Sequence, residues 1–197
     1  MSPRGRRPAG SDTRAQILAA ASAEFAEQGY AATSLRGIAR RAGVDPALVH
    51  HYFEGKPALL AEVLEVPVDP AVLIARVLAL PREEVGAGMV RSFLSIWDDP
   101  AGRQRFAVVA RSMIAQEAAA RSMREFILRE VFLRVAQAHN RDGLAPAELE
   151  RRASLAVAQM FGMALLRYVV CFPALASATP EDLVADLGPV LQGYLAP

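Results

Sequence analysis

The sequence predicts an all-α fold, in which a small N-terminal domain of three helices precedes a larger helical domain. Apolar residues recur at the three- and four-residue spacing of a helix face, and no segment alternates as a strand does. Apolar side chains make up 53% of the 197 residues, which is enough for a packed core. Pro67 and Pro70 mark the junction between the predicted domains, residues 11–65 and 66–197, and residues 1–10 are predicted to form a flexible basic arm.

The first helix is predicted over 13–28. Thr13 and Gln16 match the capping box, in which two side chains satisfy free N–H groups at a helix start. Gly29 is the expected stop, because glycine readily adopts the left-handed backbone that ends helices. The inward face is predicted to consist of Ile17, Leu18, Ala21 and Phe25.

Two short helices follow the first. Thr33 or Ser34 is expected to cap the second helix, and Gly43 to end it. Asp45 is expected to cap the third helix, which has a proline in its first turn and runs to about Tyr52. Further helices are predicted from Gly55 onward and over 70–79, 82–98, 101–115, 117–139, 146–172 and 180–195.

The charges are distributed unevenly along the chain. Residues 1–60 carry eight basic and five acidic side chains, whereas the whole chain has a net charge of only +1. A basic N-terminal part predicts a polyanionic partner. The single cysteine, Cys171, excludes a disulfide framework, and its apolar neighbours predict a buried thiol. We recognise no secretory or membrane-spanning segment, and therefore expect a cytoplasmic protein that binds no membrane, metal or cofactor.

The motif that carries the functional prediction is a helix-turn-helix. Ala39 is small enough for two helices to approach each other, Gly43 permits the turn, and Val49 can fill the crevice between the helices. This spacing suits two helices that cross near a right angle, as in DNA-binding proteins. A simple helical corner without any DNA contact is the alternative interpretation.

The residues around this motif strengthen the DNA-binding interpretation. They are Phe25, Gly29, Tyr30, Thr33, Ser34, Ile38, Ala39, Ala42, Gly43, Val44, Tyr52, Phe53 and Lys56. With these residues, the segment 12–64 closely resembles the DNA-binding domain of the tetracycline-repressor (TetR) family. The family resemblance implies a homodimeric transcriptional regulator that binds a pseudo-palindromic double-stranded operator and a small-molecule effector.

The third helix is too short to contact bases along its length, so its N-terminal half is expected to enter the major groove. Ala47 and Leu48 can contact thymine methyl groups. His50 and His51 can contact phosphates or base edges, the alternative being solvated surface histidines. Pro46 and Leu48 depart from the family pattern, because they replace polar residues and leave fewer polar contacts for sequence recognition.

Other contacts are implied by the family resemblance. Arg36 matches a position that can bind guanine bidentately, and a backbone contact is the alternative. Tyr52 and Lys56 resemble phosphate-contacting residues, and Thr33 and Ser34 can each cap a helix and donate to a phosphate. The predicted DNA-binding residues are Thr33, Ser34, Arg36, Asp45, Pro46, Ala47, Leu48, His50, His51, Tyr52 and Lys56.

The C-terminal helices are predicted to pair two chains. The segment 146–172 is apolar on nearly all faces, so it needs cover on both sides. With 180–195 it is similar to the four-helix dimer interface of the TetR family, and burial within one chain is the alternative. Arg167, in the same segment, is expected to find an acceptor in the dimer interface or the pocket, and a structural ion pair or a backbone cap is the favoured alternative. The predicted interface residues are Ala158, Phe161, Gly162, Leu165, Val169, Leu187 and Leu191.

The family resemblance also implies a ligand pocket in the C-terminal domain. Aromatic and methionine side chains suit a pocket wall because they are broad and adaptable, although each also suits an ordinary core. Few polar groups accompany them, so we expect a largely apolar effector. The candidate pocket residues are Met89, Phe93, Trp97, Met113 and Phe126.

These observations favour one function over two others. A homodimeric regulator, most simply a repressor that its effector releases from the operator, accounts for the basic N-terminal domain and the apolar C-terminal helices. An enzyme is disfavoured because the sequence has no nucleophile–base pair, metal cluster or phosphate loop. The alternative is a protein-binding helical adaptor, or a small-molecule-binding protein without operator-specific DNA binding.

Overall fold

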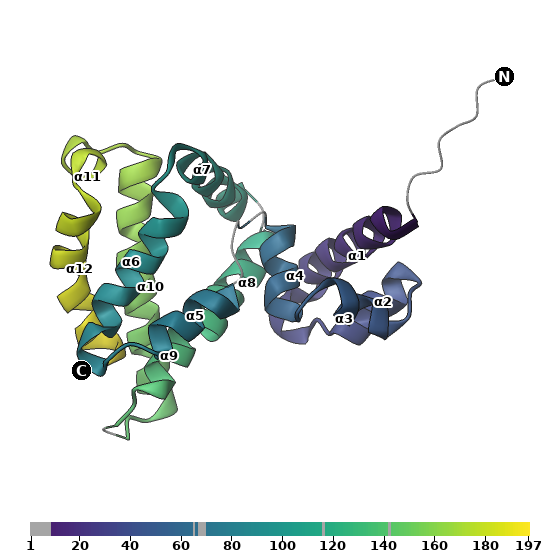
Figure 1. The fold of residues 1–197 in the computed structure, drawn as a ribbon, viewed down its shortest axis with the longest axis horizontal. Coiled ribbons are helices and arrows are strands. Elements are labelled where there is room, and N and C mark those ends of the chain that lie inside the picture. The colour runs from purple at the N-terminus through teal and green to yellow at the C-terminus, as the bar shows by residue number, and fades with distance from the viewer. Residues whose placement is uncertain (1–8, 65, 67–69, 116, 142) are drawn as a thin grey trace.

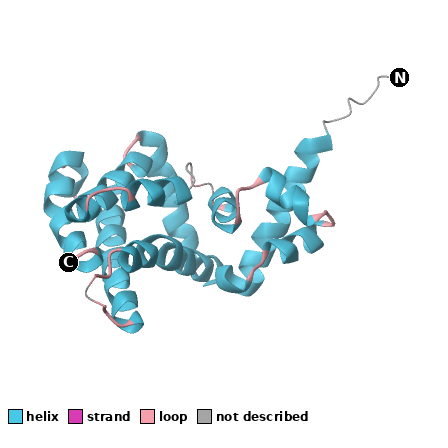
Figure 2. Cartoon of the chain, turned by 60° about the horizontal axis from the view of Figure 1, so that its bottom comes forward, coloured by secondary structure: helices cyan, strands magenta, loops and turns pink. Residues whose placement is uncertain are grey.

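The computed structural model describes residues 9–64, 66, 70–115, 117–141 and 143–197, and every regular element in these ranges is a helix (Figure 1, Figure 2). The predicted all-α fold is confirmed. Arg4, Arg6 and Arg7 of the predicted basic arm lie outside the described residues. The elements are α1 (Ala9–Ala32), α2 (Leu35–Ala42), α3 (Pro46–Tyr52), α4 (Lys56–Val63), α5 (Pro70–Leu78), η1 (Arg82–Glu84), α6 (Val85–Trp97), α7 (Pro100–Ala115), α8 (Glu117–Phe126), η2 (Ile127–Phe132), α9 (Leu133–Ala138), α10 (Pro146–Tyr168), α11 (Pro173–Ser177) and α12 (Pro180–Leu195).

The chain forms two parts in space, which we call the head (α1–α4) and the body (α5–α12). Figure 1 shows α8 next to α1, at the side of the body that faces the head, whereas α11 and α12 lie at the opposite end of the body. The head has an apolar core of its own, to which α8 contributes two side chains. Its buried members are Ile17, Ala20, Ala21, Phe25, Tyr30, Ile38, Ala39, Val49, Phe53, Leu59, Leu60, Met123 and Phe126.

Helix α1 is longer than the sequence predicted. It begins at Ala9, so the predicted capping box at Thr13 is wrong, and Thr13 lies inside the helix. Gly29, the predicted stop, has a φ of 80°, which side-chain-bearing residues rarely adopt. It kinks the chain, and one more helical turn follows up to Ala32. This last turn places the end of α1 against α8.

The helix-turn-helix forms as predicted. The Ser34 hydroxyl accepts the N–H of Gly37 and caps α2, and Gly43 ends α2 in the left-handed region with a φ of 67°. The Val44 N–H reaches back to the Ala39 carbonyl at 3.0 Å, which completes a Schellman turn. Val49 is fully buried between the helices. The local signals of capping and glycine therefore position α3 against α2.

Two expectations for the body are wrong. The helix predicted over 117–139 is interrupted by η2, whose hydrogen bonds have the wider π-helical pattern. The sequence predicts a buried thiol at Cys171, but this residue is exposed and has a φ of 58° in the turn after α10. The chain leaves the helix there, so the apolar neighbours of Cys171 no longer surround it.

Helices α6 and α12 cross at glycine positions. A Cβ atom on Gly86 would collide with the carbonyl oxygen of Gly188 and would lie 2.5 Å from the backbone nitrogen of Gln192. The Gln192 side chain joins the same crossing, because its Oε1 accepts the N–H of Gly86 at 2.9 Å and its Nε2 donates to the Arg82 carbonyl at 2.8 Å. Absence of a side chain at Gly86 thus allows α12 to lie directly on α6.

None of the helices that the structure describes is long and apolar enough to cross a membrane. In the same residues, no group of three or more His, Cys, Asp or Glu side chains is arranged to hold a metal ion.

We predict that Gly86→Ala lowers the free energy of unfolding by about 3 kcal/mol, because the added methyl group must force two backbones apart. Urea unfolding followed by circular dichroism measures the change. Gly193→Ala on α12 is the matched control, since nothing lies within 4 Å of the position that its added methyl group would take. This control should be neutral or slightly stabilising, because alanine favours helices. Equal unfolding midpoints for the Gly86 variant and the wild type would contradict the close crossing.

Candidate DNA-binding face and ligand cavity

The N-terminal half of α3 projects from the head. The Asp45 carboxylate accepts the N–H of Ala47 at 2.8 Å and so caps the helix, while Val49 anchors the opposite side. Tyr52 is half-buried at the end of α3, and its ring meets that of His51 edge-on at 5.1 Å. The exposed residues of this predicted recognition surface are Asp45, Pro46, Ala47, Leu48, His50 and His51.

The two residues before α2 have different roles. Ser34 is exposed and caps α2, so its hydroxyl lies at the surface beside the first turn. Thr33 is only 3% exposed, and its hydroxyl donates to the Gly29 carbonyl at 2.8 Å. Its side chain therefore has no surface for a phosphate, and the predicted DNA contact by Thr33 is corrected to a structural bond that closes the end of α1.

Ion pairs separate the arginines of the head into two groups. Arg41 binds Glu27 and the buried Glu24 on α1, with a distance of 3.2 Å between Nη1 and the Glu24 carboxylate, and Arg14 pairs with Glu62 on α4. Arg36 and Arg40 are both exposed on α2, and neither forms an ion pair within the described part of the chain. Uncompensated positive charge thus lies on the helix next to α3.

Lys56 is held more tightly than the sequence indicated. Its Nζ donates to the carbonyls of Tyr30 at 2.9 Å and Thr33 at 3.1 Å, and lies 4.3 Å from the centroid of the Tyr30 ring. Burial lowers the pKa of the Lys56 ammonium, against the raising effect of Glu130 and Glu125. The residue therefore joins α4 to the end of α1, and its contact with a phosphate stays a prediction.

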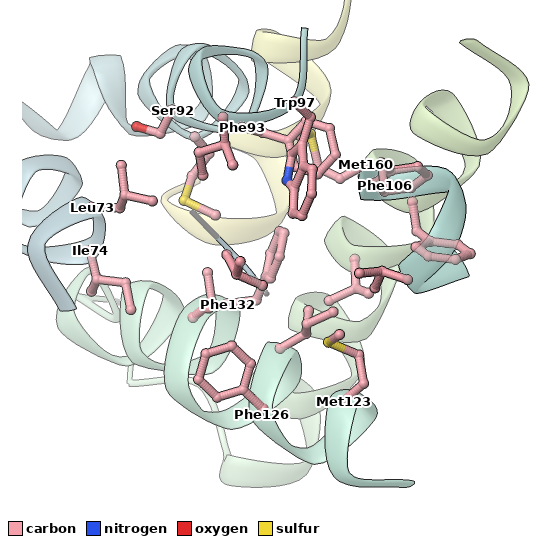
Figure 3. A pocket seen from close by; sticks show the side chains of 18 of the residues that line it. Leu73, Ile74, Ser92, Phe93, Trp97, Phe106, Met123, Phe126, Phe132 and Met160 are labelled. Carbon is pink, nitrogen blue, oxygen red and sulfur yellow. The ribbon is translucent and has the colours of Figure 1, made fainter. Parts of the chain in front are cut away.

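The body contains a cavity of about 160 Å³, shown in Figure 3. Its wall is formed by α5, α6, α7, α8, η2 and α10, together with Val66. Four of the five predicted pocket residues line it, namely Met89, Phe93, Trp97 and Phe126, whereas the Met113 side chain lies outside the described residues. The other lining residues are Leu73, Ile74, Val77, Ser92, Ile96, Phe106, Val109, Met123, Ile127, Val131, Phe132, Val157, Met160 and Phe161.

The cavity and the head share side chains. Met123 and Phe126 on α8 line the cavity and also belong to the buried core of the head. The Phe126 ring meets the Tyr30 ring edge-on, with 5.5 Å between their centroids. Polar bonds hold the same joint, because the Ser122 hydroxyl donates to the Phe25 carbonyl at 2.7 Å and the Ala31 N–H donates to Glu125 at 2.7 Å. The same side chains therefore belong both to the cavity wall and to the packing around α1.

A buried ion pair lies at the C-terminal end of α6, directly after Trp97. Arg167 on α10 is 4% exposed and binds both oxygens of Asp98, with Nε–Oδ1 at 2.8 Å and Nη2–Oδ2 at 3.1 Å. It also donates to the carbonyls of Ala178, at 3.0 Å, and Leu175. Arg167 thus has both an ion-pair partner, the Asp98 carboxylate, and backbone carbonyl acceptors. Together these bonds tie α6, α10 and α11 to one another.

Charge and burial compete at this pair. Burial alone would raise the pKa of Asp98, but the hydrogen bonds and positive charge of Arg167 outweigh it and hold the pKa below its ordinary value. Burial and the Asp98 carboxylate raise the pKa of the Tyr168 hydroxyl, which donates to Asp98 at 3.2 Å.

The predicted interface residues lie on both sides of the outer helices. Ala158 is exposed on α10, and a methyl group on Gly162 would meet nothing within 4 Å. One assignment is corrected, because Leu191 is fully buried within the body. The Phe161 ring lies 5.8 Å from that of Phe106 and lines the cavity, and its contact with a second chain stays a prediction. The half-buried members of the predicted set are Phe161, Gly162, Leu165, Val169 and Leu187.

The head contains a helix-turn-helix, and the body is a separate helical domain with an apolar cavity. This combination is typical of transcriptional regulators that bind DNA through their N-terminal domain. Comparison with known families agrees. The family "Bacterial regulatory proteins, tetR family" matches residues 17–63, and "Tetracyclin repressor-like, C-terminal domain" matches residues 83–195. The chain belongs to the TetR family of transcriptional regulators, and its head is the DNA-binding domain of that family.

Individual relatives resemble the chain over different lengths. The HTH-type transcriptional regulator BetI of Rhizobium meliloti is 39% identical over 84 residues, which are 41% of each protein. The HTH-type transcriptional activator FasR of Mycolicibacterium smegmatis is 39% identical over 69 residues, or 35% of this chain and 32% of FasR. The chain thus matches less than half the length of these relatives. A TetR-family regulator from Streptomyces coelicolor, of known structure, is 34% identical, with 98% of this chain and 99% of that one covered and a TM-score of 0.46.

We predict that Asp98→Ala lowers the free energy of unfolding by about 3–5 kcal/mol at neutral pH, because it leaves the Arg167 guanidinium buried without a counter-charge. The double variant with Leu at position 98 and Met at position 167 should recover most of this loss, since it removes both charges. Urea unfolding of the three proteins measures the differences.

The contribution of this pair should depend on pH in a defined direction. The pKa of Asp98 is lowered in the folded state, so its stabilisation is present above the unfolded-state pKa of about 3.9 and is lost as the pH falls through the folded-state value. The difference in unfolding free energy between wild type and Asp98→Ala should therefore narrow below about pH 4. A difference that stays constant down to about pH 2 would contradict the ion pair.

Proposed function

We propose that the chain is a homodimeric repressor that binds a pseudo-palindromic DNA operator and is released by a small, largely apolar effector. The observation that carries the proposal is the exposed N-terminal half of α3, capped by Asp45, together with the exposed Arg36 on the neighbouring helix α2. A rigid helix end with positive charge next to it suits a major groove flanked by phosphates. We assign this protein to the cytoplasm, where such a regulator meets DNA.

Sequence recognition in this proposal comes from few groups. Leu48 is 38% exposed and can contact a thymine methyl group, whereas the Asp45 carboxylate is engaged by its own helix. Arg36, His50 and His51 then supply the polar contacts to base edges or phosphates, with Ser34 at the backbone. Pro46 and Ala47 allow close approach because their side chains are short.

Dimerisation in this proposal uses the outer face of α10 together with α12. Ala158 is exposed on α10, and nothing lies within 4 Å of the position that a methyl group on Gly162 would take, so a second helix can approach closely there. Two-fold pairing would carry two α3 helices to successive major grooves, about 34–36 Å apart. One head alone makes too few contacts for specific binding, so dimerisation and operator recognition depend on each other.

Effector release in this proposal follows from the shared wall of the cavity. An occupant that moves Met123 or Phe126 changes the packing of α1, which carries the rest of the head. The orientation that two heads need on one operator is then lost. The effector can weaken operator binding only to the extent that its affinity for the released arrangement exceeds its affinity for the operator-bound arrangement.

We predict that Arg36→Ala weakens binding to the promoter DNA upstream of the protein's own gene by about 5-fold to 100-fold, as loss of a base or phosphate contact does. Fluorescence anisotropy at low and moderate salt measures the affinity. Arg91→Ala is the control, because it removes one exposed positive charge from α6 and should alter binding little. Salt-insensitive wild-type binding, or none, would reject operator binding and favour the protein-binding adaptor.

We predict that Ala158→Arg combined with Gly162→Arg converts the protein to monomers, because two long charged side chains then cover the predicted contact of α10. Light scattering after size exclusion should give twice the 21.2 kDa chain mass for the wild type and the single mass for the variant. Val72→Arg is the control, since Val72 is 48% exposed on α5, away from the predicted interface. A variant that keeps the wild-type mass would place the interface elsewhere.

A further inference from the structure

The cavity wall is almost free of polar groups, and this restricts what can bind. Of the described side chains that line the cavity, none carries a charge, and the only hydroxyl belongs to Ser92. In Figure 3 the Ser92 oxygen points away from the middle of the pocket. A carboxylate or an ammonium group in such a site would lose its hydration without compensation, which costs several kcal/mol or more. The part of a ligand that this wall encloses is therefore expected to be neutral.

One donor in this wall has no partner. Trp97 is only 8% exposed, and its ring meets those of Phe93 at 6.3 Å and Phe106 at 5.6 Å between centroids. Within the described residues its indole N–H donates to no acceptor, although buried tryptophans usually have one. The indole nitrogen is not completely buried, so an acceptor atom can reach it. Figure 3 shows the Trp97 ring among the lining side chains, with its nitrogen on the edge toward Leu73.

From this unpaired donor we infer that the cavity binds a neutral, compact, mostly apolar molecule that carries one carbonyl-type acceptor, such as a ketone, an ester or a lactone. The acceptor bonds the Trp97 N–H, and the aliphatic and aromatic wall surrounds the rest. An indole N–H can only donate, so the ligand must offer an acceptor lone pair, and a carbonyl oxygen offers one without bringing an unpaired donor into the apolar wall. This inference rests on the proposed role of the cavity as the effector site.

The size of the cavity limits the ligand further. A volume of about 160 Å³ is close to that of a dry apolar cavity known to hold benzene. A single ring or a short branched chain fits this space. The Trp97 bond then fixes the orientation of a ligand that apolar contacts alone would leave free to rotate.

The sequence provides a direct probe, because Trp97 is the only tryptophan. The indole N–H of the 15N-labelled full-length protein, without DNA, therefore gives one resonance. Cyclohexanone should shift its proton downfield in a saturable manner, because a hydrogen bond forms. Methylcyclohexane, which is similar in shape but lacks an acceptor, should enter the cavity without a downfield shift, and cyclohexanecarboxylate should not bind. An indole resonance that stays in place with saturating cyclohexanone, or moves equally with both neutral probes, overturns the inference.

A variant tests the same bond by affinity. The ratio of the affinities for cyclohexanone and methylcyclohexane should fall about fivefold in Trp97→Phe, which keeps an aromatic ring and loses the donor. Phe106→Leu is the matched control, because it alters the wall without removing a donor and should change both affinities alike. An unchanged ratio in Trp97→Phe contradicts the inference. These measurements use no DNA, so a negative result would reject the Trp97 bond without rejecting operator binding. Loss of operator binding would likewise leave the Trp97 bond untouched.

Discussion

The packing of α8 against α1 is the contact on which the rest of the molecule depends. The head is too small to cover its own aromatic side chains, and Phe126 and Met123 from the body complete the core around Tyr30. The same two side chains form part of the cavity wall. Burial of two such side chains contributes about 3–6 kcal/mol, which is a large share of the stability of a small domain. The cavity and the DNA-binding face are therefore parts of one packed structure.

The second constraint holds helix α6 in place. The ion pair of Asp98 and Arg167 joins the end of α6 to α10 directly after Trp97, while glycine contacts hold α6 against α12. Helix α6 therefore has its position set by bonds at its end and by close packing along its length. The cavity side that faces the head is formed by α8 and η2, where a π-helical segment replaces regular α-helix. When a ligand binds, we expect α8 and η2 to move more than α6, because the ion pair and the close helix crossing hold α6 in place.

Much of this architecture could be predicted from local signals. Ser34, Gly43 and Asp45 set the helix-turn-helix because capping and left-handed backbone are properties of single residues. Four cavity residues were predicted from their type. The burial of Thr33, the inward direction of Phe161 and the partners of Arg167 depend on how distant helices meet, and spacing in one helix does not contain that information. The role of α8 in the head core was missed for the same reason.

Hydrogen exchange of the α1 amides in Phe126→Ala tests the central claim most directly. Phe132→Ala is the comparison, because Phe132 also lines the cavity but packs only in the core of the body. Well below the unfolding temperature, where local opening dominates exchange, the account predicts faster exchange in α1 for Phe126→Ala and wild-type exchange there for Phe132→Ala. Equal exchange of α1 in the two variants would show that the head does not depend on the cavity wall.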